Sequence, residues 1–197
     1  LHFDAASKST PEEPPRPRVY NSAALVDRSG NILGTYDKSH RVMFGEYIPF
    51  AEYLPFLYRI TPLTGGINAG REPAVFELNG HFFAPSICYE TVIPHVMRRQ
   101  ALATAGEDSG KPADVLINLT NDAWYWGSNE LDQHLACGVF RAVETRRPLV
   151  IAANGGISAW IDRTGVVRAQ SPKQQPDVIL ADVELGNMYS PYVRFGD

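Results

Sequence analysis

Residues 114–120, Asp-Val-Leu-Ile-Asn-Leu-Thr, form a nearly continuous apolar run, which is typical of a β-strand buried on both faces of a sheet. Apolar side chains then recur at helical spacing over residues 129–146, which predicts an amphipathic helix. Residues 149–153 predict a second buried strand. A strand and a helix also precede this unit, so two strand–helix–strand units are present. The sequence therefore predicts a layered α/β protein.

The remaining predicted elements are mostly short strands joined by turns. One hairpin joins residues 19–26 to 30–36, and a second joins 74–78 to 81–88. The second hairpin turns at Asn79-Gly80, a pair that favours a type I′ turn. Further along the chain we expect a helix over 91–105, a strand pair over 157–162 and 166–169, and a last strand over 178–183.

The composition is that of a globular protein. The chain has 197 residues, of which 44% are hydrophobic and 20% are charged, and this is enough for one sizeable core. The formal net charge of −4, without a long basic run, makes nucleic acid an unexpected partner. No apolar stretch is long enough to span a bilayer, so we expect any membrane anchor to lie in segments outside this chain.

The two cysteines, Cys88 and Cys137, lie far apart and predict neither a disulfide framework nor a zinc site, because CxxC spacing is absent. Cys88 comes at the end of a predicted strand and is followed by Tyr-Glu. Cys137 lies in a predicted helix beside core positions, where packing is the simpler role. A cysteine nucleophile needs a stabilised thiolate and a positive group near the developing oxyanion. Lys38, just after another strand, could supply that charge.

Six stretches resemble the nitrilase, or carbon–nitrogen hydrolase, superfamily, and within it the bacterial apolipoprotein N-acyltransferases. They are YDKSHRVMFGEYIPF (36–50), ICYETVIP (87–94), LINLTNDAW (116–124), QHLACGVFRAVETRRPLV (133–150), AANGGISAWID (152–162) and YSPYVRFGD (189–197). They occur in the order that the superfamily has. The resemblance implies an α-β-β-α sandwich, here incomplete at its N-terminal side. It also implies that residues 1–197 are the C-terminal two-thirds of one nitrilase-like catalytic domain.

The superfamily uses a Glu–Lys–Cys triad, and the resemblance assigns two members of it here. Lys38 matches the triad lysine and Cys88 the nucleophile. Glu46 matches a second glutamate that supports the site. The backbone N–H of Tyr89 would donate to the oxyanion beside Lys38, and Glu90 would order the loop around the nucleophile. No residue matches the triad glutamate, so we expect this chain alone to be inactive.

Other polar residues have weaker claims to a function. Asn121 and Asp122 follow a buried strand and either line a pocket or make a turn. His40, His95 and His134 lack metal-ligand spacing, and hydrogen-bonded structural roles are expected for them. Arg141 and Glu144 are expected to pair on adjacent helical turns.

Residues 43–60 form a segment rich in aromatic side chains, interrupted by two prolines; residues 1–18 are expected to be a proline-rich loop. The apolar segment is either a loop packed on the body or a mobile arm that touches lipid. The resemblance favours the second reading, with lipid contacts from Phe44, Tyr47, Phe50 and Phe56.

The resemblance implies an acyltransferase that needs no cofactor or metal. It would move an acyl chain from a phospholipid, through a thioester on Cys88, to the N-terminal amine of a diacylglyceryl-cysteine lipoprotein. The expected location is the bacterial inner membrane, with the catalytic domain periplasmic and the membrane reached through segments absent here. Two alternatives stay open: a soluble nitrilase-type amidase, and a non-catalytic fragment that lacks the triad glutamate.

Overall fold

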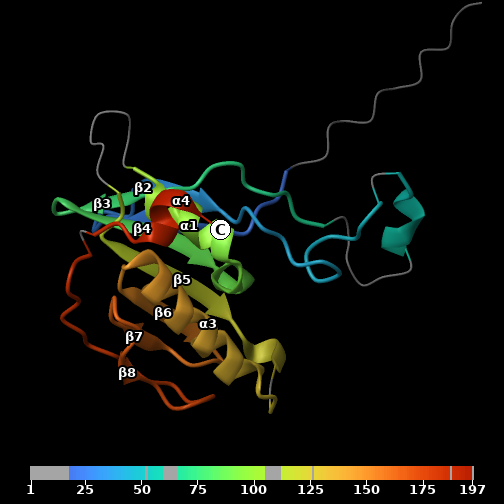
Figure 1. Cartoon of the computed structure of the whole chain (residues 1–197). Coiled ribbons are helices and arrows are strands. Elements are labelled where there is room, and N and C mark those ends of the chain that lie inside the picture. Colours follow the sequence, from blue (N-terminus) through green and yellow to red (C-terminus); the bar gives the residue numbers. More distant parts are fainter. Residues whose placement is uncertain are drawn as a thin grey trace, which may run out of the picture.

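The computed structural model describes residues 18–51, 53–59, 66–104, 112–125, 127–186 and 188–196. Apart from Arg18, the predicted loop over 1–18 lies outside these residues. Figure 1 shows a body made of sheets and helices, and an extended segment that leads away from this body and carries the short 3-10 helix η1 (Pro55–Arg59).

A six-stranded mixed sheet forms the centre of the body. Its strands lie in the order β3 to β8, with β4, β5 and β6 parallel to one another and the outer strands antiparallel. Their bounds are β3 (Phe76–Leu78), β4 (His81–Ile87), β5 (Val115–Asn121), β6 (Leu149–Asn154), β7 (Ala159–Ile161) and β8 (Val167–Gln170). The predicted apolar strand over 114–120 is therefore the inner strand β5, which explains why it carries few polar residues.

Three helices cover one face of this sheet: α1 (Pro94–Leu102), α3 (Glu130–Thr145) and α4 (Pro191–Phe195). The core between them and the sheet contains Ala84, Met97, Leu116 and Leu149, all of which are fully buried. Gly138 allows α3 to approach closely, because a Cβ at this position would lie 3.0 Å from Cδ1 of Ile151.

A two-stranded antiparallel sheet, β1 (Ser22–Val26) and β2 (Ile32–Asp37), packs on the opposite face. Ala23 and Tyr36 from this sheet form a second core cluster with Ile87 of β4. Ala84 and Ile87 are three residues apart on one strand, so their side chains point to opposite faces. Among the described residues the layers are thus helix, six-stranded sheet and two-stranded sheet. This arrangement confirms the predicted mixed α/β fold.

Most predicted elements are confirmed, including both hairpins, the helix over 129–146 and the strand pair near 157–169. Asn79 and Gly80 have φ values of 53° and 75°, as a type I′ turn requires. Two predictions need correction. The helix expected over 91–105 begins only at Pro94, after the 3-10 helix η2 (Cys88–Val92), and ends at Leu102. Proline suits the first turn of a helix, because its missing N–H has no partner there anyway.

The strand predicted over 178–183 is wrong, since the structure has no strand in that segment. Val178 and Leu180 are 82% and 93% exposed. A run of apolar residues favours a strand only where a neighbouring strand supplies hydrogen bonds and a face to cover. Among the described residues, none pairs with this segment.

Candidate active site

Lys38 follows the last residue of β2, and its main chain is held from two sides. Its N–H donates to the carbonyl of Asn21 at 2.8 Å, and its carbonyl accepts from the N–H of Gly70, also at 2.8 Å. Gly70 is required here, because a Cβ on it would lie only 2.1 Å from the carbonyl oxygen of Asp37. The lysine backbone is therefore fixed before its side chain makes any contact.

The ammonium group of Lys38 is buried and paired with Glu46. Nζ lies 2.9 Å from both carboxylate oxygens of Glu46, and the lysine is 2% exposed. The same carboxylate accepts from the side-chain amide of Asn21 at 3.2 Å and from the N–H of Val42 at 2.8 Å. Burial alone would raise the pKa of Glu46, but the hydrogen bonds from Lys38, Val42 and Asn21 and the charge of Lys38 bring it below its ordinary value. This segment therefore holds a charged Lys–Glu pair.

Cys88 lies at the carboxyl end of β4, where the strand passes into η2. Its φ of +52° places a non-glycine residue in the left-handed region, which costs roughly 1–3 kcal/mol and persists only where neighbours hold it. The carbonyl of Cys88 accepts from the side-chain amide of Asn118 at 3.2 Å and from the hydroxyl of Thr91 at 3.3 Å. The amide of Asn118 also donates to Ser86 at 3.0 Å. Cys88 is not in a disulfide. The strand end thus presents a free thiol on a constrained turn.

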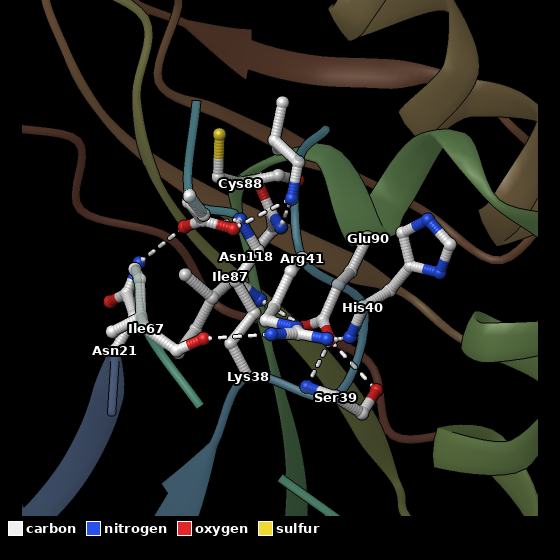
Figure 2. A network of polar contacts seen from close by, with 12 residues as sticks. Asn21, Lys38, Ser39, His40, Arg41, Ile67, Ile87, Cys88, Glu90 and Asn118 are labelled. Carbon is white, nitrogen blue, oxygen red and sulfur yellow. Dashed lines mark hydrogen bonds and ion pairs between the residues drawn. The ribbon is translucent and has the colours of Figure 1, made fainter. Parts of the chain in front are cut away.

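The carboxylate of Glu90 ties the cysteine turn to the lysine turn. One oxygen accepts from the N–H and hydroxyl of Ser39, both at 2.8 Å, and from the N–H of His40 at 3.0 Å. The other oxygen accepts from the N–H of Ile87 at 2.8 Å, and the hydroxyl of Tyr36 reaches both oxygens. Glu90 is 0% exposed. Figure 2 shows this network, in which the residues next to Lys38 and the residues next to Cys88 meet at one carboxylate.

Among the described residues, the phenol of Tyr36 is the remaining side chain that donates to the carboxylate of Glu90. Burial, followed by the negative charge of Glu90, raises the pKa of Tyr36 far above its ordinary value. Tyr36 therefore stays a neutral donor. A buried carboxylate that accepts from several main-chain N–H groups fixes two chain segments relative to each other.

Three other residues expected at the site, Tyr89, Asn121 and Asp122, have different surroundings. Tyr89 is the second residue of η2, partly exposed, with its ring centroid 6.4 Å from that of His40. Asn121 is exposed and bonds to Ala123 and Asn154, which is the turn-making role. Asp122 is buried and lies 3.1 Å from Nδ1 of His134.

Three polar residues near the site were missed by sequence reasoning or assigned only a structural role. Asn21 contacts Glu46, Asn118 supports Cys88, and His134 pairs with Asp122. The signal for Asn118 was present in the sequence, because an amide inside an apolar strand needs buried partners. Arg141 and Glu144 pair at 2.8 Å, as predicted.

The apolar segment that contains Glu46 exposes most of its aromatic side chains. Phe44, Phe50 and Phe56 are 69%, 72% and 54% exposed. Tyr47 differs, because the guanidinium of Arg41 lies 4.4 Å from the centroid of its ring. We call residues 43–51 and 53–59 the aromatic arm; positions 52 and 60 lie outside the described residues.

Other features of the described residues set limits on the site. A cavity of about 410 Å³ lies along β2, lined by Thr35, Asp37, Arg71 and Ala74 among others, and its lining does not include Lys38. Within the described ranges, no three His, Cys, Asp or Glu side chains are grouped as a metal site needs. In that same part of the chain, no helix is both long and apolar enough to cross a membrane.

The structure thus places a free cysteine at a strand end, on a left-handed turn that a buried carboxylate links to a Lys–Glu pair, within a mixed α/β fold. The carbon-nitrogen hydrolase family matches residues 5–190, and the chain belongs to that family.

Two similar proteins, both apolipoprotein N-acyltransferases, are longer than this chain. The chain is 38% identical to an apolipoprotein N-acyltransferase of Rhodopirellula baltica over 92% of its own length and 32% of that protein. It is also 38% identical to an apolipoprotein N-acyltransferase of Geobacter metallireducens, over 92% of this chain and 33% of the relative. The chain therefore spans about a third of the length of these two relatives.

A solved structure shares the fold. XC1258 from Xanthomonas campestris, described as a CN-hydrolase superfamily protein with an arsenic adduct in the active site, superposes with a TM-score of 0.58. The two are 21% identical, over 89% of this chain and 61% of that one, so the likeness concerns the fold alone.

Proposed function

We propose that this chain carries the nucleophile of an apolipoprotein N-acyltransferase. The enzyme moves an acyl chain from a phospholipid to the N-terminal amine of a diacylglyceryl-cysteine lipoprotein. The observation that supports this most is the Glu90 carboxylate, which binds the main chain beside Lys38 and beside Cys88 at once. The two acyltransferase relatives suggest the reaction, and the site offers groups suited to it.

In the first step, the thiolate of Cys88 attacks the ester carbonyl of a phospholipid. The Nζ of Lys38 and the N–H of Tyr89 donate to the oxyanion that develops on the carbonyl oxygen. The C–O bond to the glycerol breaks, the leaving alkoxide takes the proton that the thiol lost when the thiolate formed, and a lysophospholipid departs. The acyl chain is then held as a thioester on Cys88.

In the second step, the α-amine of the lipoprotein attacks the thioester carbonyl. The same two donors stabilise the second oxyanion, the C–S bond breaks, and the thiolate is restored as the amine loses a proton. The Glu46 carboxylate keeps Lys38 charged and oriented through both steps. The family resemblance implies a further glutamate as the base, and we assign no residue of this chain to it.

The aromatic arm is proposed to meet the lipid donor. It contains Glu46 and exposes Phe44, Phe50 and Phe56 to the surroundings. Aromatic side chains of this kind suit the interface between lipid and water. Such an arm would place the ester of a phospholipid beside the thiol, which fits a catalytic domain on the periplasmic face of the bacterial inner membrane.

A second candidate is an amidase that uses water as the acceptor, and the carbon-nitrogen hydrolase family supports it. The two functions share the nucleophile and differ in the acyl donor. A longer protein that carries this chain together with the triad glutamate is therefore incubated with a phospholipid and a diacylglyceryl peptide, and in parallel with small aliphatic amides. We expect N-acylated peptide and lysophospholipid from the first mixture and no ammonia from the second. Ammonia release without peptide acylation would establish the amidase.

Variants of the two cysteines make this test specific. Cys88→Ala should abolish peptide acylation, whereas Cys137→Ala should retain it, because Cys137 lies on α3 and makes no contact with the network around Cys88 that the described residues record. Peptide acylation that persists in Cys88→Ala would contradict the proposed nucleophile.

A further inference from the structure

His134 and Asp122 form a second buried pair of titratable groups near Cys88, which the proposed reaction does not use. His134 lies in the second turn of α3 and is 5% exposed. Its Nδ1 lies 3.2 Å and 3.1 Å from the two carboxylate oxygens of Asp122. The hydroxyl of Thr120 donates to the same carboxylate at 2.5 Å. Because a carboxylate only accepts, Nδ1 of His134 carries a proton.

The other ring nitrogen, Nε2, is buried and has no hydrogen-bond partner among the described residues. Burial lowers the pKa of His134, but acceptor groups raise it above its ordinary value: the carboxylate of Asp122 first, then the charge of Glu130 and the main-chain carbonyl of Cys88. Glu130 lies one helical turn earlier, and its Oε2 is also buried without a hydrogen bond in the described structure.

A neutral ring would fit this environment poorly. With the proton on Nδ1, the lone pair of Nε2 would face other acceptors, and a buried acceptor without a donor costs about 1–3 kcal/mol. A second proton on Nε2 converts it into a donor toward those acceptors. Its charge would also be balanced by two carboxylates, Asp122 on one side and Glu130 on the other.

We propose that His134 is a positioning residue for the nucleophile: as an imidazolium held by Asp122, it directs its Nε2–H toward the main-chain carbonyl of Cys88. This inference rests on the proposed role of Cys88. The contact would add a third donor to those from Asn118 and Thr91, and would hold the left-handed turn at φ +52°.

The positive charge of His134 also affects the thiolate of Cys88, besides holding the turn at this residue. Asp122, Glu130 and Cys88 all act electrostatically on Tyr125, and an uncompensated pair of carboxylates disfavours a thiolate in the same surroundings. Tyr125 also senses Cys88, Asp122, Glu130 and Tyr89; burial, followed by the charge of Glu130, raises the pKa of its phenol, so it stays neutral. The imidazolium is therefore the group of this cluster that offsets its carboxylates.

The protonation state of His134 is tested directly by nitrogen-15 NMR of the histidine side chains of the purified protein between pH 5 and 9. The His134 signal is assigned by its loss in His134→Gln, or by elimination through replacement of the other histidines if that variant does not fold. We expect both ring nitrogens of His134 to be protonated at pH 7. In Asp122→Asn we expect the ring to be neutral at pH 7, because the carboxylate that holds the imidazolium is absent. A neutral ring at pH 7 would overturn the proposal.

The consequence for Cys88 is tested by its rate of alkylation by iodoacetamide, followed by mass spectrometry as a function of pH. His134→Gln keeps a donor but loses the charge, and we expect alkylation at pH 7 to slow by about three- to tenfold and to match the wild type at high pH. His95→Gln, an exposed change on α1, is the matched control, and Cys137 is an internal one. An unchanged pH profile would refute the role of the charge. No lipid is present, so this result does not depend on acyl transfer.

Discussion

Replacement of Glu90 by glutamine tests whether one buried carboxylate holds the site together. One oxygen of Glu90 faces the donors of Ser39 and His40, and the other faces the N–H of Ile87 at 2.8 Å. Glutamine has a single acceptor oxygen. If that oxygen faces Ser39, its amide NH₂ meets the N–H of Ile87, and two donors oppose each other in a buried position.

The magnitude follows from these contacts. A hydrogen bond to a charged group contributes about 1.5–3 kcal/mol, and a buried N–H left without an acceptor costs about 1–3 kcal/mol more. We therefore expect Glu90→Gln to lower the free energy of unfolding by about 3–5 kcal/mol. For a domain of this size, that corresponds to a fall of about 10 °C in Tm.

The assay is thermal unfolding followed by circular dichroism, with Glu77→Gln as the control. Glu77 is exposed on β3, so its replacement should leave Tm unchanged. The alkylation rate of Cys88 should also change in Glu90→Gln, because Ile87 precedes the cysteine and loses its partner. A Tm within about 2 °C of the wild type would refute the reasoning, since it would mean that the predicted loss of bonds costs less than about 1 kcal/mol.

Three further predictions concern separate parts of the molecule. Because the pKa of Glu46 is lowered in the folded protein, the ionised carboxylate stabilises the fold above pH 4.5, and this stabilisation is lost as the pH falls through the pKa of the folded protein. Glu46→Gln should therefore lower the free energy of unfolding by about 2 kcal/mol at pH 7, measured by urea unfolding. The difference in unfolding free energy between this variant and the wild type should shrink below pH 4. Burial would raise the pKa of Asp162, but hydrogen bonds at its turn lower it to about 2. Asp162→Asn should therefore lower the free energy of unfolding by about 1 kcal/mol at pH 7, and this difference should disappear as the pH approaches 2. An equal loss of unfolding free energy at all pH values would show that the charge of Asp162 is not involved. Phe50→Ser in the aromatic arm should weaken binding to phospholipid vesicles about tenfold without changing Tm, whereas the similarly exposed Phe140→Ser on α3 should not; equal effects of the two would contradict a lipid-contacting arm.

The elements with the clearest apolar patterns were the most predictable from sequence. The run over 114–120 and the helix over 129–146 carry their burial in their apolar pattern, and both occur as expected. The segment 178–183 shows the limit of this reasoning. Its pattern resembles a strand, but a strand also needs a neighbour, and residue spacing does not reveal whether one is present.

The candidate site was predictable only in part. Lys38 and Cys88 are 50 positions apart, and no periodicity brings them together, so their association was inferred from the family resemblance. The contacts of Glu46 and Glu90 fit the supporting roles that the resemblance implied. The pairing of His134 with Asp122 could not be inferred, because a single histidine on a helix does not indicate which strand end it will face.

The central claim is that Cys88 accepts an acyl chain from phospholipid. The most direct measurement is mass spectrometry of peptides from a longer protein that carries this chain together with the triad glutamate, after incubation with a phospholipid of defined chains and without an acceptor. We predict one acyl group of matching mass on the peptide that contains Cys88, released by neutral hydroxylamine as a thioester is. An acyl group on a different residue, or none on Cys88 while lysophospholipid accumulates, would contradict the account.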